Sequence, residues 1–314
     1  MKLKCLILGG GGFIGSHLCD ELIEKGYSVT VFDKLNFTPK NISHLGSKIK
    51  IIEGDFLNEK DLKNALNGID IVFHLVSSTV PASSNDNPVY DIETNLIPTL
   101  HLLNECLKQK IKKVIFLSSG GTVYGIPKSL PLKETDIGKP ICSYGIMKKT
   151  IEDYLFMYHR LYGLDYSVFR LSNPYGERQN PFFVQGVISV FLYKLITGQP
   201  IEIWGDGNII RDFIYIKDVV NVIVDSIDRP KKDKVFNLGS GTGHRLTEIA
   251  EIMQEVSGLK MNIVFNEQRT IDVPVNVLDN TLIKKSFHWK PVVGIYEGIT
   301  RTYLFLKSEL KDIK

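Results

Sequence analysis

The chain has 314 residues, 43% of them hydrophobic and 23% charged, with a formal net charge of +3. Such a composition is typical of a globular protein with one large hydrophobic core or two unequal ones, and it excludes a disordered chain. With 38 basic and 35 acidic residues, the chain also lacks the strongly basic balance of a nucleic-acid-binding protein.

The spacing of cysteines and histidines argues against a metal site. The four cysteines, at positions 5, 19, 106 and 142, have no short paired spacing, and the seven histidines lack the HExxH pattern. Neither zinc nor a disulfide framework is expected. No segment reaches the roughly 18 uncharged apolar residues of a membrane span, and the N-terminus lacks the features of a signal peptide. We therefore expect a soluble, cytoplasmic protein with reduced cysteines and no membrane contact.

Short apolar runs alternate with helical patterns in the first half of the chain. Strands are predicted over residues 3–8, 28–32, 49–52, 70–75, 113–117 and 166–171, and helices over 16–25, 59–67, 88–109 and 143–162. Strands that are apolar on both faces and alternate with helices indicate a parallel sheet covered by helices. The predicted fold class is α/β, a Rossmann doubly wound parallel sheet.

The pattern changes after residue 172. A helix over 185–197 and a strand over 201–203 precede the turn GDGN, whereas a strand at 213–216, a helix at 217–227 and a strand at 235–238 are expected to return to the main sheet. We predict a Rossmann domain of residues 1–172 with 213–238. Residues 173–212 and 239–314 would form a smaller C-terminal α/β lobe.

A glycine-rich turn follows the first predicted strand and opens the first helix. Gly9, Gly12 and Gly15 permit a tight turn, close approach of a pyrophosphate and close contact between helix and strand. The helix N-terminus, with Phe13 and Ile14, offers free N–H groups to phosphates. The spacing departs from the usual G-x-G-x-x-G, so the context of strand and helix carries the interpretation. It predicts a dinucleotide site.

Two acidic residues lie at the ends of neighbouring strands. Asp33 lies 24 positions after Gly9, where a carboxylate would accept hydrogen bonds from the adenosine ribose and repel a 2'-phosphate. This favours NAD over NADP, although Lys34 follows directly. Asp55 ends the third strand and would contact the adenine; the alternative is that it caps the helix beginning near Asn58.

Tyr144 and Lys148 are four residues apart, and so lie on one face of a predicted helix. A nearby ammonium, together with a positively charged nicotinamide, lowers the pKa of a phenol and lets it act as a base near neutral pH. Such a pair is often a chance surface arrangement. Together with the glycine-rich turn and the segment SSGGTVYG at 118–125, it predicts a catalytic pair.

The segments GGGGFIGSH, EGDF, SSGGTVYG, YGIMK, FRLSNPYGERQ and GDGNIIRDFIYIKDV together resemble the extended short-chain dehydrogenase/reductase family. Within it, the chain is similar to nucleotide-sugar epimerases of the UDP-glucose 4-epimerase type, over nearly its whole length. The resemblance implies bound NAD and a nucleoside-diphosphate sugar, such as a UDP-sugar, as substrate. It also implies that Tyr144 is the catalytic base, that Lys148 steadies the cofactor ribose and the phenolate, and that Phe56, Leu75 and Ser118 contact the cofactor.

SSGGTVYG departs from the family pattern at one position. Where related epimerases carry a serine or threonine that hydrogen-bonds the reacting sugar oxygen, this chain has Gly120. Hydroxyl groups remain at Ser119 and Thr122, so Thr122 or a water would assist Tyr144; the alternative is weakened or lost catalysis. The carboxylate that dehydratases and decarboxylases of the family carry after this position is replaced by Gly121 and Thr122, which disfavours elimination chemistry.

Four residues of the second half match substrate-binding positions of the family. Asn173 matches a residue near the diphosphate, and Arg211 and Arg269 match two arginines that hold the pyrophosphate through bidentate hydrogen bonds. Asn276 aligns with a position where a tyrosine closes the pocket around the sugar C2 substituent. A smaller residue would leave room for an N-acetyl group, so N-acetylhexosamine derivatives are expected to be accepted. The resemblance implies that the smaller C-terminal α/β lobe binds the nucleotide sugar. Trp204 and Phe213 are expected to be core aromatics, with uracil stacking as the alternative.

The resemblance implies a UDP-hexose or UDP-N-acetylhexosamine 4-epimerase that works through a transient 4-keto sugar. One alternative is a nucleotide-sugar 4-ketoreductase that consumes external NADH or NADPH. Another is a catalytically silent NAD-binding sensor, which Gly120 makes conceivable. The helices predicted over 88–109 and 143–162 resemble those through which family members pair, so a homodimer is expected.

Overall fold

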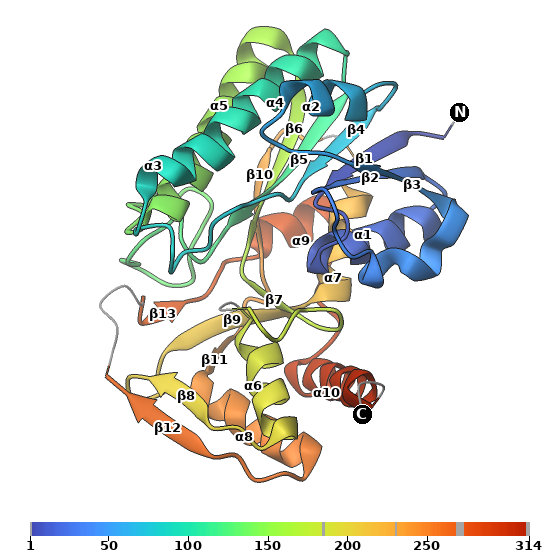
Figure 1. Cartoon of the computed structure of the whole chain (residues 1–314). Coiled ribbons are helices and arrows are strands. Elements are labelled where there is room, and N and C mark those ends of the chain that lie inside the picture. Colours follow the sequence, from blue (N-terminus) through green and yellow to red (C-terminus); the bar gives the residue numbers. More distant parts are fainter. Residues whose placement is uncertain (1, 184–185, 230, 268–272, 312–314) are drawn as a thin grey trace. The chain divides into compact units, whose positions relative to one another are not determined.

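The computed structural model describes residues 2–183, 186–229, 231–267 and 273–311 (Figure 1). It divides into two compact units. Unit one comprises Met1–Val123, Pro140–Arg170 and Ile223–Phe236, and unit two comprises Tyr124–Lys139, Leu171–Val222 and Asn237–Lys314. Residues 124–139 and 213–222 therefore group with unit two, whereas the sequence assigned both segments to the Rossmann domain. Among the described helices, none has the length and apolar character needed to cross a bilayer.

A seven-stranded parallel sheet forms the centre of unit one. Its strands are β1 (Lys4–Leu8), β2 (Ser28–Asp33), β3 (Ile49–Glu53), β4 (Ile71–His74), β5 (Lys113–Ser119), β6 (Asp165–Leu171) and β10 (Val235–Leu238). They run in the order β10-β6-β5-β4-β1-β2-β3. The chain reverses direction across the sheet between β1 and β4, where doubly wound sheets bind ligands beyond the carboxyl ends of their strands. The predicted fold class is confirmed.

Helices cover both faces of this sheet. The α-helices are α1 (Phe13–Glu24), α2 (Glu59–Ala65), α3 (Pro88–Asp91), α4 (Ile97–Lys108) and α5 (Ser143–Tyr162). Two further segments are the 3₁₀ segment η1 (Lys40–Lys48) and the π-helical segment η2 (Ile92–Leu96). Helix α7 (Ile216–Asp225) has residues in both units. Leu62 of α2, Leu102 of α4 and Ile151 of α5 share one hydrophobic core with Val72 and Phe116 of the sheet. These three helices therefore pack on the same face (Figure 1).

The helix predicted over 88–109 contains a π-helical turn. α3 is followed by η2, and α4 begins with Pro98 in its first turn. Proline lacks an N–H and its ring clashes with the carbonyl four residues earlier, so an uninterrupted α-helix through Thr94 and Pro98 is unfavourable. A wider turn relieves this clash, and π-helical turns often occur at functional sites.

Unit two has a mixed sheet and a strand pair. The mixed sheet contains β7 (Asn173–Tyr175), β9 (Ile210–Tyr215), β11 (Gly243–Arg245) and β13 (Val275–Asn276), and β8 (Ile201–Trp204) pairs with β12 (Ile263–Asn266). Its helices are α6 (Val187–Thr197), α8 (Leu246–Ser257), α9 (Thr281–Phe287) and α10 (Ile295–Lys311).

The prediction that residues 213–216 return to the main sheet is wrong. They belong to β9, which pairs in parallel with β7 and β13 and antiparallel with β11. The run Phe213 to Tyr215 is buried on both faces, and such a run fits either sheet equally well, so its pattern could not identify the partner strands. The strand predicted at 235–238 is β10 and does lie at the edge of the main sheet.

A buried ion pair connects α5 to the strands beneath it. Arg170 of β6 donates to Glu152 of α5, with its Nη2 atom 2.7 Å from Oε2, and the two side chains are 7% and 3% exposed. Ser118 at the end of β5 donates its hydroxyl to Glu152 Oε1 at 2.5 Å. Because a buried charge is tolerated only when paired and hydrogen-bonded, these contacts fix the position of α5 on the sheet.

Arg170→Met is expected to lower the free energy of unfolding by about 3–5 kcal/mol, because it leaves the Glu152 carboxylate buried without its cationic partner. The double variant Arg170→Met/Glu152→Gln removes both charges and should regain part of that loss. Urea unfolding followed by circular dichroism measures both. A single variant as stable as the wild type would show that the pair contributes nothing.

Candidate active site

The turn between β1 and α1 meets the steric requirements of a dinucleotide site. Gly9 has φ of +83° and donates its N–H to the Phe32 carbonyl oxygen at 2.8 Å. A Cβ atom at Gly15 would lie 2.3 Å from the Gly9 carbonyl oxygen, so α1 approaches the turn too closely for any side chain. Gly12 is the N-cap of α1 and offers no side-chain cap to the first N–H groups of the helix. Those groups, from Phe13 onward, suit a pyrophosphate.

Asp33 connects the end of β2 to the glycine-rich turn. Its Oδ2 atom accepts from the Gly11 N–H at 2.8 Å and its Oδ1 atom accepts from the Lys34 N–H at 2.9 Å. The carboxylate therefore lies beside the turn, as an interaction with an adenosine ribose requires.

The other predicted cofactor residues of unit one lie at the ends of β3 and β4. Asp55 is exposed and accepts from the Leu57 N–H, whereas the side chain of Asn58 caps α2, so the alternative that Asp55 is the cap is wrong. The Phe56 ring is buried 5.3 Å from the ring of His74. The Leu75 N–H donates to the carbonyl oxygen of Leu8 at 3.2 Å, and Leu75 lies beside Gly9.

Tyr144 and Lys148 lie in the first turns of α5, as predicted. Lys148 is 3% exposed, and its Nζ atom donates to the Leu117 carbonyl oxygen at 3.0 Å. The same ammonium lies 5.4 Å from the Tyr144 ring centroid and 4.7 Å from that of Phe116. The structure thus brings the phenol and the ammonium together at the carboxyl end of β5.

The protonation of this pair is set by burial and by neighbouring charges. Burial lowers the pKa of Lys148 to about 8, and the carboxylates of Asp91 and Glu152 oppose this shift. Burial, with Cys142 and Asp91, raises the pKa of Tyr144. The expectation that Lys148 lowers the phenol pKa is therefore not met by the protein alone. Two positive charges were expected to lower the pKa of Tyr144, the Lys148 ammonium and the nicotinamide ring of NAD. Of these, the nicotinamide ring is the one that remains to lower it.

The segment SSGGTVYG turns back against the start of α5. Thr122 and Val123 donate their N–H groups to the Ser119 carbonyl oxygen at 3.3 and 3.1 Å. A Cβ atom at Gly145 would lie 2.8 Å from the Thr122 carbonyl oxygen, so only glycine lets this turn approach Tyr144 so closely. The segment ends β5 with glycines because its backbone must pack directly on the helix that carries Tyr144.

The hydroxyl groups of this turn have different environments. The Ser118 hydroxyl is committed to Glu152, so its side chain supports α5. The Thr122 Oγ1 atom is buried and has no hydrogen-bond partner among the residues that the structure describes. A buried hydroxyl without a partner is unfavourable, and a ligand oxygen beside it would remove that penalty. Thr122 is therefore the hydroxyl best suited to replace the one missing at Gly120.

In unit two, β9 and β13 bring together two predicted substrate residues that are far apart in sequence. Asn276 pairs in register with Arg211, and Arg211 Nη1 donates to the carbonyl oxygen of Val273 at 2.6 Å. Asn276 is 1% exposed. Asn173 on β7 donates its side-chain amide to the Asp212 carbonyl oxygen at 3.0 Å. Arg269 lies outside the described residues.

Asp212, next to Arg211, is a buried carboxylate that fixes the loop after β10. It accepts from the N–H groups of Ser240, Gly241 and Leu278, and from the Ser240 hydroxyl. Phe213 is buried against Tyr175, as expected of a core aromatic. Trp204 is 36% exposed, so the prediction that it is a core aromatic is wrong.

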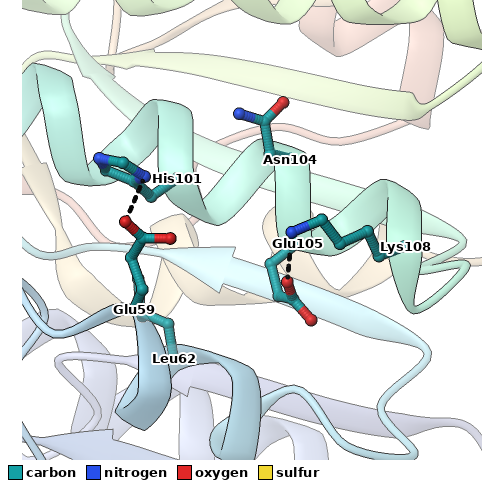
Figure 2. Close-up of a pocket in the computed structure, with 6 residues that line it drawn as sticks. All are labelled: Glu59, Leu62, His101, Asn104, Glu105 and Lys108. Carbon is teal, nitrogen blue, oxygen red and sulfur yellow. Dashed lines mark hydrogen bonds and ion pairs between the residues drawn. The ribbon is translucent and has the colours of Figure 1, made fainter.

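A small pocket elsewhere in unit one is unrelated to these residues. Figure 2 shows it between α2 and α4, where His101 pairs with Glu59 at 3.1 Å and Lys108 with Glu105 at 3.2 Å. His101, Glu59 and Lys108 are exposed, Glu105 is 12% exposed, and the four side chains pair with one another, which is typical of a crevice between surface helices.

The sequence did not identify the residues that hold the N-terminus of α5. Cys142, its N-cap, makes no side-chain cap hydrogen bond. The Ser143 N–H instead donates to Asn85 Oδ1 at 2.9 Å, and the Tyr144 N–H to Ser84 Oγ at 3.0 Å. The missing cap residue before α5 was the available signal, but only the fold shows which side chains replace it.

Comparisons with known proteins agree with this geometry. The model of the NAD dependent epimerase/dehydratase family matches residues 5–239. The chain belongs to this family. As a member of it, the protein is an NAD-dependent enzyme that modifies nucleotide sugars.

Similar members of the family are known from other organisms. A putative UDP-glucose 4-epimerase of Methanocaldococcus jannaschii is 37% identical over 96% of this chain and 98% of its own length. The structure of a UDP-glucose 4-epimerase with UDP-glucose from Thermotoga maritima is 36% identical and has a TM-score of 0.93, over 98% of this chain and 100% of that one. A UDP-N-acetylglucosamine 4-epimerase structure from Methanobrevibacter ruminantium is 30% identical, with a TM-score of 0.92 over 98% and 100%.

Family members of other chemistry are similar too. They include a UDP-N-acetyl-alpha-D-glucosaminuronate decarboxylase of Bacillus cytotoxicus, 31% identical over 99% of this chain and 100% of that protein, and a dTDP-4-dehydro-6-deoxyglucose reductase of Escherichia coli, 32% identical over 96% of each. Membership in the family therefore leaves the reaction to be argued from the site residues.

Gly15→Ala is expected to weaken NAD retention on the order of tenfold or more, about 1.4 kcal/mol, because the added Cβ would push α1 away from the Gly9 carbonyl oxygen. Release of NAD from purified protein on denaturation measures the retained cofactor. Gly294→Ala, where nothing lies within 4 Å of the added Cβ, is the matched control. Equal NAD content in both variants would contradict the assignment of this turn.

Proposed function

We propose that the protein is an NAD-dependent 4-epimerase of a UDP-hexose or UDP-N-acetylhexosamine. The observation that carries the proposal is the Tyr144–Lys148 pair beside the buried, unpartnered hydroxyl of Thr122. A phenol that can exchange a proton and a hydroxyl that can hydrogen-bond the same sugar oxygen are what reversible oxidation of an alcohol requires. No carboxylate occupies positions 120–122, where elimination would need one.

Bound NAD would supply the hydride acceptor, and later the donor, for the sugar C4 atom. Tyr144 accepts the proton of the 4-hydroxyl as the alcohol becomes a ketone, and Thr122 donates a hydrogen bond to that oxygen. Lys148, protonated and fixed on the Leu117 carbonyl beside the Tyr144 ring, would favour the phenolate form together with the positive nicotinamide of bound NAD. After the 4-keto sugar has rotated so that its other face is toward the cofactor, Tyr144 would return the proton to the oxygen as the hydride returns to C4, so no net oxidation occurs.

The substrate-binding residues of unit two support a nucleoside-diphosphate sugar. Arg211 provides a guanidinium suited to a diphosphate, and Asn173 an amide beside it on the neighbouring strand. We assign the same diphosphate role to Arg269 from its sequence context. Asn276 in place of a larger side chain supports acceptance of an N-acetyl group at C2, in line with the UDP-N-acetylglucosamine 4-epimerase similarity.

The second candidate is a 4-ketoreductase that consumes external NADH. The similarity of the chain to a dTDP-4-dehydro-6-deoxyglucose reductase supports this candidate. It would use the same Tyr144 and Lys148. Stoichiometric loss of NADH with a 4-keto sugar would identify it.

Wild-type protein with catalytic NAD and no NADH is expected to convert UDP-galactose and UDP-N-acetylgalactosamine to their C4 epimers. Tyr144→Phe should lower kcat about 10²–10⁴-fold, because no group then exchanges the proton. Thr122→Val should lower it about 10–100-fold, and Thr122→Ser should retain most activity. ¹H NMR of each reaction measures the conversion.

Three results would count against this proposal in different ways. No conversion of either sugar by NAD-loaded wild type would favour the reductase, another nucleotide sugar or a silent sensor. Conversion of UDP-galactose alone would show that Asn276 does not admit the N-acetyl group. Unchanged activity of Thr122→Val would assign the missing hydroxyl to Ser119 or a water.

We also propose that the enzyme is a homodimer that pairs through α3, α4 and α5. These helices pack on one another in unit one and carry exposed apolar side chains, among them Val89 at 62%, Ile146 at 55% and Phe156 at 61% exposure. Apolar side chains that gather on neighbouring helices are typical of a contact surface.

Phe156→Glu is expected to convert a dimer into a monomer, because it places a charge where apolar surface would be buried. Light scattering after gel filtration at several protein concentrations measures the mass. Ile137→Glu, at the 95% exposed Ile137 of unit two, is the control and should remain dimeric. A monomeric wild type, or equal effects of both variants, would refute this interface.

A further inference from the structure

Asp91, at the end of α3, has an unusual environment for a carboxylate. It is fully buried, and its hydrogen bonds come from neutral donors. Oδ1 accepts from the Thr79 hydroxyl at 2.5 Å and from the Asn95 amide at 3.0 Å, and Oδ2 accepts from the Ser143 hydroxyl at 2.7 Å. Burying a charge without a contacting cation is costly, so a neutral side chain here would be expected unless the charge has a use.

These contacts join three segments around the start of α5. Thr79 belongs to the loop after β4, Asn95 to the π-helical segment η2, and Ser143 directly precedes Tyr144. The same loop supplies Ser84 and Asn85, whose side chains accept from the first N–H groups of α5. The Tyr144 backbone is therefore held by side chains of this loop, and the Asp91 carboxylate joins the same loop, through Thr79, to Ser143.

The charge of Asp91 also acts on the buried ammonium of Lys148. The groups around that ammonium are Asp91 from α3, Glu152 and Tyr144 from α5, and His74 from β4, with the Phe116 ring of β5 below it. Glu152 is already paired with Arg170. Burial and Lys148 lower the pKa of His74 to about 3, so His74 is neutral near pH 7.

We propose that Asp91 is a positioning residue for the Tyr144–Lys148 pair. Its carboxylate holds Ser143 to the loop after β4 and, unlike that of Glu152, is not paired with an arginine. Removal of that charge disfavours protonated Lys148, because Asp91 opposes the effect of burial on the lysine. Removal also favours ionised Tyr144, because Asp91 opposes phenolate formation. Both groups then titrate at lower pH.

The test separates charge from hydrogen bonding with Asp91→Asn, Ser143→Ala and the exposed control Asp153→Asn. NMR of ε-¹³C-labelled lysine follows the titration of Lys148, assigned by its absence from Lys148→Arg. Asp91→Asn is expected to lower the Lys148 midpoint by on the order of one pH unit. Ser143→Ala should leave the midpoint unchanged, and so should Asp153→Asn. If Asp91→Asn folds poorly, Asp91→Ser, which is smaller and also neutral, takes its place and should lower the Lys148 midpoint in the same way.

Turnover provides the second measurement, and this part rests on the proposed epimerase function. Asp91→Asn should move the kcat profile to lower pH, whereas Ser143→Ala should lower kcat by up to about 100-fold without moving the profile. An unshifted Lys148 midpoint in both neutral variants, or an equal shift in Ser143→Ala, would overturn the inference. Because the NMR titration needs no sugar turnover, an inactive wild type would refute the epimerase proposal alone.

Discussion

A lysine ammonium buried beside a phenol is the constraint around which unit one is built. Lys148 donates one hydrogen bond to the Leu117 carbonyl oxygen and lies over the Phe116 ring, but burial still disfavours its charge. Two buried carboxylates on different helices, Asp91 and Glu152, compensate. Each must itself be satisfied, Glu152 by Arg170 and Asp91 by neutral donors, so the site extends through α3, η2, α5, β5 and β6.

Close backbone packing is the second recurring requirement, and it explains the glycines. Gly15 lets α1 approach the glycine-rich turn between β1 and α1, and Gly145 lets the SSGGTVYG turn pack on α5. The space for a Cβ atom is taken by the Gly9 carbonyl oxygen at Gly15 and by the Thr122 carbonyl oxygen at Gly145. The same turn leaves the Thr122 hydroxyl buried and unpartnered, which is the polar feature that a sugar oxygen would satisfy.

Local pattern predicted the fold and the proximity of Tyr144 and Lys148 because both depend on short-range spacing. Tyr144 and Lys148 share a helix, and the glycine-rich turn joins adjacent elements. Residues whose roles depend on tertiary contacts were missed: Asp91 and Ser84 hold α5 from a different segment, and no spacing rule connects them to Tyr144. The prediction that β9 joins the main sheet was wrong for the same reason, because a fully apolar strand does not specify its neighbouring strands.

The fate of the hydrogen on the sugar C4 atom distinguishes a redox-neutral 4-epimerase from its alternatives. UDP-[4-²H]galactose is incubated with NAD-loaded enzyme and unlabelled NADH in solution, and the products are analysed by mass spectrometry and NMR. A redox-neutral 4-epimerase predicts the C4 epimer with its deuterium retained, because the hydride leaves and returns within one active site. An epimer that has lost its deuterium to the external NADH pool, or no epimer at all, would contradict this account.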